Sequence, residues 1–153
     1  MLPDDAVRTI TIYPRHTDGV TGLVTTVRRV LKRCSFEERS ITTALATGQV
    51  LRIPSVIRIF TDDNPDLQYI EPHEWAKKGI LDLDGFWTIN LVERTFIVPW
   101  EETRTFSIGT SGAVTAAENT FARDNPGCVR ATEKNDNRKA HGSHIRLGAI
   151  SAP

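Results

Sequence analysis

Two histidines, His141 and His144, form the pattern in this sequence that most resembles a metal site. Together with Asp136 they would supply the imidazole and carboxylate ligands that zinc accepts. A second ligand pair at a defined spacing is missing, and the histidines flank Gly142 and Ser143 in a polar connection. We therefore interpret them as part of a surface loop, and we expect no metal ion and no cofactor.

Cysteine catalysis is a second chemistry that the residues allow. Cys34 follows the basic residues Arg28, Arg29, Lys32 and Arg33, and nearby cations lower the pKa of a thiol. The residues that alternate with Cys34 are apolar, which favours a buried strand cysteine. Because no cysteine or serine lies in a context that pairs a nucleophile with a base, we expect no catalytic residue and no enzymatic activity.

Basic and aromatic residues could also bind single-stranded nucleic acid, as barrels of the oligonucleotide-binding type do, here through Arg28, Lys32 and Trp87. On a strand, however, the four basic residues near Cys34 divide between two faces. Three tryptophans in a chain with few other aromatic residues are more typical of core or interface anchors. We assign that role to Trp75, Trp87 and Trp100, and keep nucleic-acid binding as an alternative.

Length and composition indicate one domain that spans residues 1–153. The chain is 39% hydrophobic and 25% charged, which is ordinary for a globular protein. Its formal net charge of +0 argues against a free-standing nucleic-acid binder. The two cysteines form no CxxC pair and predict no disulfide framework. We expect no signal peptide and no membrane span, since no apolar run approaches the roughly 20 residues that a bilayer needs.

The charges are unevenly distributed along the chain. Residues 1–34 contain six basic and three acidic side chains, residues 62–102 three and ten, and residues 123–153 six and three. Basic ends with an acidic middle would let the protein stack on copies of itself or on a neighbouring ring. The alternative is that these charges only solvate a surface.

The elements that must position these residues are mainly strands. Alternation and β-branched residues predict them over 7–13, 23–36, 50–61, 86–89, 91–98, 128–132 and 144–150, with the pairs 86–89/91–98 and 128–132/144–150 adjacent. A short helix is expected over 72–78, with Pro72 in its first turn and Gly79 after its end. We predict a mainly β fold, a small barrel or sandwich with one short helix and long loops. One long loop lies near 37–48, and 101–127 forms an irregular insertion in which 116–122 is either a short helix or irregular.

The order of several short motifs resembles that of a known protein class. These motifs are Thr9–Arg15, Val30–Phe36, Val50–Pro54, Pro72–Trp75, Phe86–Ile89 and Asn135–Arg138. Each is short, and together they follow the order found in small head–tail connector proteins of tailed bacteriophages, of the head-completion or head-closure (stopper) type. Residues 103–125 lie outside the resemblance.

The resemblance implies a structural virion protein, made in the cytoplasm of the host bacterium. Such subunits form a ring, here expected to be six-fold, that closes the portal channel, retains packaged double-stranded DNA and joins the tail. The expected partners are sister copies, a portal or adaptor protein above, and a tail terminator or tail tube below. In similar stoppers a loop between early strands reaches into the channel, which here would place Glu37, Glu38, Arg39, Thr42 and Thr43 beside DNA. A tail terminator or an adaptor ring protein is the alternative within this class.

Overall fold

A computed structural model describes residues 7–38, 55–106, 108–138 and 143–152. Its strands and helices follow one another as β1 (Val7–Tyr13), β2 (Arg15–Thr17), β3 (Val24–Thr26), β4 (Arg29–Glu38), β5 (Ser55–Phe60), η2 (Thr61–Asp63), β6 (Gln68–Tyr69), α1 (Pro72–Lys77), η3 (Ile80–Asp82), β7 (Phe86–Trp87), β8 (Phe96–Val98), α2 (Ser111–Asp124), β9 (Val129–Asn137) and β10 (His144–Ser151). No helix of this part of the chain has the length and apolarity that crossing a membrane requires.

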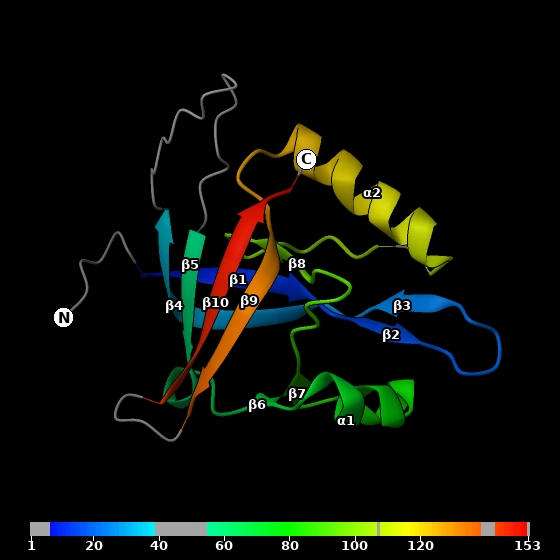
Figure 1. The fold of residues 1–153 in the computed structure, drawn as a ribbon, viewed down its shortest axis with the longest axis horizontal. Helices are drawn as coiled ribbons and strands as arrows, with labels where there is room; N and C mark the ends of the chain where they lie inside the picture. The colour runs from blue at the N-terminus through cyan, green and yellow to red at the C-terminus, as the bar shows by residue number, and fades with distance from the viewer. Residues whose placement is uncertain (1–6, 39–54, 107, 139–142, 153) are drawn as a thin grey trace, which may run out of the picture.

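Six antiparallel strands form the centre of the molecule, in the spatial order β1-β4-β5-β10-β9-β8 (Figure 1). The short strand β8 pairs with β1 on one side and with β9 on the other, so that the sheet closes into a barrel. Closure leaves few unpaired backbone groups at sheet edges. The prediction of a mainly β fold is confirmed.

The barrel interior is filled by side chains from alternate positions of the strands, because neighbouring residues of a strand point to opposite faces. In β1, for example, Ile10 and Ile12 are fully buried. The same cluster contains Leu31, Cys34, Phe36, Ile57, Ile59, Ile97, Val129, Ala131, Ile145, Leu147 and Ala149. These mostly aliphatic side chains fill the interior of the small barrel.

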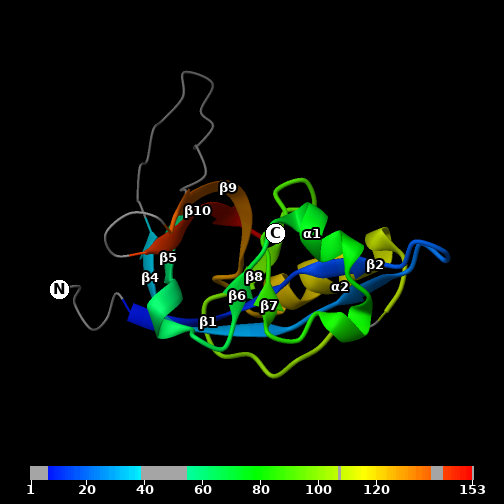
Figure 2. The same ribbon diagram turned by 90° about the horizontal axis from the view of Figure 1, so that it is seen from below.

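The segment from η2 to β7 packs along one edge of the barrel, where α1 and the β6–β7 pair lie together (Figure 2). The rings of Tyr69 and Trp87 meet edge to face at 4.9 Å inside the barrel core. The outer surface of this segment is acidic. Its exposed charged residues are Asp62, Asp63, Asp66, Glu74, Lys77, Asp82 and Asp84, and we call this surface the acidic edge.

Helix α2 covers a second core at another side of the barrel. Its side chain Phe121 packs with Tyr13, Phe96 and Phe106 in a cluster of edge-to-face rings. The helix begins at Thr110, whose hydroxyl accepts a hydrogen bond from the backbone N–H of Ala113 at 3.2 Å, as a helix N-cap does. The insertion predicted to be irregular over 101–127 is therefore helical over 111–124.

Several predicted elements are confirmed and others need correction. The strand 7–13, the helix at 72–77 and the closing hairpin of β9 and β10 all exist. The predicted strand 23–36 is divided into β3 and β4, and the short strand β2 precedes it. The strands β7 and β8 do not pair with each other, since β7 pairs with β6 and β8 with β1 and β9. Their partners lie far away in the sequence, which local patterns cannot reveal.

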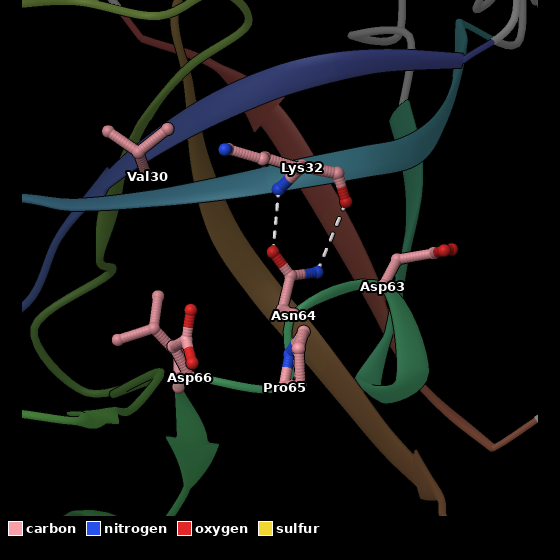
Figure 3. A pocket seen from close by; sticks show the side chains of 7 residues that line it. Val30, Lys32, Asp63, Asn64, Pro65 and Asp66 are labelled. Atoms are coloured by element: carbon pink, nitrogen blue, oxygen red, sulfur yellow. Dashed lines mark hydrogen bonds between the residues drawn. The ribbon is translucent and has the colours of Figure 1, made fainter.

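A bulge in β4 is held in place by Asn64. The pairing of β1 with β4 shifts between Arg8 and Ile10, and Arg33 takes the left-handed conformation at φ 55°. The side chain of Asn64 accepts a hydrogen bond from the backbone N–H of Lys32 at 2.7 Å and donates to its carbonyl at 3.1 Å. Figure 3 shows this bridge at the wall of a small hollow of about 160 Å³. The amide of Asn64 thereby replaces the strand partner that the bulge lacks.

Replacement of Asn64 by alanine should destabilise the fold by about 2 kcal/mol, because backbone groups of Lys32 and Phe60 lose the hydrogen-bond partner that the buried Asn64 side chain provides. Urea unfolding monitored by tryptophan fluorescence measures the loss. The control is Asp66→Ala, an exposed change in the same turn, which should stay within about 0.5 kcal/mol. Equal stability of the two variants would contradict the role of Asn64.

Candidate functional site

The residues predicted to line a channel divide between a strand and the undescribed part of the chain. Glu37 and Glu38 belong to β4, where they pair with Val56 and Ser55 of β5. Their assignment to a loop is wrong, because pairing with β5 extends the strand beyond its apolar residues. The other three predicted loop residues, Arg39, Thr42 and Thr43, lie outside the described residues, as does most of the predicted loop 37–48.

The three tryptophans lie at different depths. Trp87 is 1% exposed in the barrel core, and Trp75, on the buried face of α1, is 2% exposed. The indole N–H of Trp75 donates to the backbone carbonyl of Arg15 at 3.0 Å. Trp100 is partly buried against the second core. Trp87 is thus unavailable for stacking on a nucleic-acid base, and Trp100 is the tryptophan that retains solvent-facing surface.

The basic cluster near Cys34 is divided by structural contacts. Arg29 donates to the carbonyls of Phe86 at 2.8 Å and Leu83 at 2.9 Å, which fastens β4 to the β7 segment. The guanidinium of Arg28 bonds to the carbonyl of Glu102. The other two members of the cluster point outward at the bulge. This arrangement offers no continuous groove for phosphates.

Neither cysteine is activated as a nucleophile. Cys34 is 0% exposed and Cys128 is 2% exposed. Burial raises the pKa of the Cys34 thiol to about 12 and that of the Cys128 thiol to about 11. Both groups are therefore protonated thiols at neutral pH, whereas a nucleophile must be a thiolate.

The metal-like pair is only half described. His141 lies outside the described residues, and His144 packs its ring on Phe60 and lies 3.2 Å from the side-chain amide of Asn137. The described residues contain no group of three His, Cys, Asp or Glu side chains arranged to hold a metal ion.

The most concentrated buried chemistry is an ionic cluster that the sequence did not reveal. Glu118 of α2 is fully buried, and its Oε1 accepts hydrogen bonds from Arg15 at 2.6 Å and from Arg130 at 3.0 Å. Arg15 begins β2 and Arg130 lies in β9, so one carboxylate joins three elements distant in sequence. Nearby, burial raises the pKa of Glu93, while the charge of Arg15 lowers it and that of Glu118 raises it.

A surface hollow of about 300 Å³ adjoins this cluster. It is lined by Val92, Glu93, Arg94, Thr115, Asn119, Arg130, Ile150 and Ser151. These residues come from the turn before β8, from the middle of α2, from the start of β9 and from the end of β10. The hollow combines an apolar rim with charged groups, and its polar walls are already engaged in bonds such as that from Arg130 to Asn119 at 2.8 Å.

The β2–β3 hairpin projects from the barrel on the side toward which α2 extends (Figure 1). It is held along its length, at His16 in the middle of β2 and at Val24, next to the loop at its tip. The ring of His16 is hydrogen-bonded to the carbonyl of Lys78 at 2.6 Å, and Val24 exchanges backbone hydrogen bonds with Gly109 at 2.8 and 3.2 Å. At its tip Val20 is 96% exposed. The hairpin is a firmly held arm that presents an apolar side chain to solvent, and we call it the arm.

Comparison with known proteins places the chain in a family. The model of DUF6751, described as a family of unknown function, matches residues 6–150. The chain belongs to the DUF6751 family. No match to this DUF6751 chain is found among curated proteins or among solved structures. The match includes both the arm and the ionic cluster.

Glu118→Gln should destabilise this DUF6751 protein by about 3 kcal/mol, because the change leaves two buried guanidinium groups without their counter-charge. Chemical denaturation gives the free energy of unfolding. Glu101→Gln makes the same chemical change at an exposed position and should cost less than about 0.5 kcal/mol. A Glu118→Gln protein as stable as this control would show that the cluster does not hold α2 to the barrel.

The two thiols should react at least about tenfold more slowly with a disulfide reagent in the native protein than in concentrated guanidinium chloride, since burial suppresses the thiolate. Absorbance of the released thiol follows the reaction at mildly alkaline pH. Rapid labelling of Cys34 in the folded protein would reopen cysteine chemistry as a function.

Proposed function

We propose that this DUF6751 chain is a structural subunit of a tailed-bacteriophage virion that assembles into a ring at the head–tail junction. The observation that carries the proposal is the arm on a filled barrel. The interior of the barrel is occupied by buried aliphatic and aromatic side chains, while the arm ends in Val20, which is 96% exposed. A protein built this way acts through its outer surface, toward other protein chains.

Further exposed apolar side chains on turns support an assembling subunit. Leu81 is 88% exposed, Val92 is 94% exposed and Ile108 is 63% exposed. They lie in η3, in the turn before β8 and in the segment before α2. When two different surfaces of a subunit bind each other in neighbouring copies, the copies associate head to tail. Such a row closes into a ring if the rotation from one subunit to the next divides a full turn evenly.

The charge distribution supports contacts with neighbouring rings. The acidic edge gathers six exposed carboxylate side chains against one exposed lysine, and it would complement a basic surface on a portal or adaptor protein above, or on a tail terminator or tail tube below. With a formal net charge of +0, the subunit would surround packaged double-stranded DNA without gripping its phosphates.

The order of the sequence motifs supports the head-completion, or stopper, position, in a six-fold ring that closes the portal channel. A tail terminator or an adaptor ring protein is the alternative within the same class. The protein would be made in the host cytoplasm and carried in the virion, and its role involves no turnover of a substrate. The oligonucleotide-binding alternative has lost Trp87 as a stacking platform, since that side chain is 1% exposed.

Electron microscopy of the purified full-length chain at high concentration should show rings, and native mass spectrometry should give the number of subunits. In addition, mass spectrometry of phage particles should find the protein in mature virions and not in unfilled procapsids, because a stopper is added after DNA packaging. Presence in isolated tails but not in tailless filled heads would favour the tail terminator instead.

Two results together would overturn the proposal. One is a chain that stays monomeric at every concentration tested, and the other is its absence from purified virions.

A further inference from the structure

We infer that the tip of the arm docks beside Val92 of a second copy of this chain, in the hollow between the turn before β8, α2 and β10. This inference rests on the proposed ring, and it names the contact that builds it. The occupant is the segment Asp18–Leu23 of the neighbouring subunit. The arm contributes no residue to the hollow of its own chain, so the contact joins two different surfaces head to tail.

The tip of the arm is rigid before it meets a partner. One carboxylate oxygen of Asp18 accepts hydrogen bonds from the backbone N–H groups of Val20 at 2.8 Å and Thr21 at 3.0 Å. The loop is closed by the bond from the N–H of Gly22 to the carbonyl of Asp18 at 3.0 Å, and Gly22 adopts φ 72°. A preorganised loop loses little conformational entropy on binding, yet this one holds its valine almost wholly in water.

The rim of the hollow is built in the same way. The side-chain oxygen of Asn90 accepts from the backbone N–H of Val92 at 2.9 Å and of Glu93 at 3.1 Å, and Arg94 adopts φ 53°. Val92 is 94% exposed. The two turns are thus alike. In each, a valine two residues after the Asp or Asn that accepts the hydrogen bonds of the turn points into solvent. Neither valine contributes to its own core, and burial against each other would remove both from water.

Charge and size fit the same contact. Asp18 is the only acidic residue of the tip, and hydrogen bonds from Thr21 and Val20 keep its pKa below the ordinary value, so it is charged at neutral pH. The hollow presents the exposed cation Arg94 at its rim, next to the half-buried Glu93, whose pKa is raised by burial. Its volume of about 300 Å³ suits a branched side chain and the turn that carries it, and is at the low end for a small-molecule site.

A second copy explains these features better than a different partner. Both halves of the contact lie on one chain, so every subunit offers one arm and one hollow. An open row of subunits leaves one arm and one hollow unoccupied at its ends, whereas a closed ring occupies all of them. The contacts of the arm with Trp75 at its base, with the Lys78 carbonyl through His16, and with Gly109 beside its tip fix its direction and hence the rotation between neighbours.

Site-directed cross-linking tests the contact in the full-length chain. Val20→Cys protein and Val92→Cys protein are mixed in equal amounts and treated with a short bismaleimide. We expect mixed dimers that neither protein forms alone, and a ladder of higher species when one chain carries both changes. The unmodified chain controls for its buried cysteines. Leu81→Cys, at a position that is 88% exposed, replaces Val92→Cys as the matched control and should give no specific product with Val20→Cys.

Charge and shape variants give a second reading by sedimentation velocity. Val20→Asp should weaken self-association on the order of tenfold, as expected for the loss of one buried valine. Asp18→Asn keeps the hydrogen-bond acceptor of the turn and removes only its charge, so association should become less sensitive to salt. Both positions are exposed, and circular dichroism verifies that the fold is retained.

The outcomes separate this inference from the proposed function. Rings that form without 20–92 cross-links, or that survive Val20→Asp unchanged, overturn the docking of the arm and leave the ring in place. A 20–92 ladder from a protein that is absent from virions supports the docking and removes the phage role. Cross-linking at Leu81 equal to that at Val92 overturns the specific contact.

Discussion

One buried carboxylate determines how the outer parts of the molecule sit on the barrel. Glu118 places its negative charge between two guanidinium groups, at 2.6 Å from Arg15 and 3.0 Å from Arg130. Removing three charged groups from water is costly, and the cost is offset only when their geometry is well matched. The cluster therefore favours a single arrangement of α2, β2 and β9 over looser ones. The same arrangement brings Arg130 to 5.1 Å from the ring of Phe96, so the ionic cluster and the second core support each other.

The same cluster helps to fix the direction of the arm. Arg15, the first residue of the arm, is held at both ends, with its side chain bound to Glu118 and its carbonyl bound to the indole of Trp75. A two-stranded hairpin alone is marginally stable in water, and strands of three residues would not stand away from a barrel without such support. The residues that bury charge inside the subunit thus also determine where its apolar tip points. The stability of the fold and the direction of the arm are in this way linked through one side chain.

Local signals predicted the parts of the fold that local forces build. The alternation of β1, the proline and glycine around α1, and the β9–β10 hairpin are all readable from neighbouring residues. Helix α2 was not, because its buried face at Val114, Glu118, Phe121 and Ala122 contains a glutamate where a helix normally shows an apolar residue. The charge that breaks the pattern is the charge that holds the helix.

The candidate site was hidden for a different reason. A single valine in a polar turn gives no signal in the sequence, and only the structure shows that Val20 and Val92 face solvent from turns held by side-chain hydrogen bonds. Backbone pairing offers the barrel little means of assembly, since its strands close on themselves and the outer edge of β3 is bridged to Gly109. In the proposed ring, contacts between copies would therefore be made by side chains on projecting turns. In the proposed assembly a second copy covers both valines, which removes them from water and leaves the filled core unchanged.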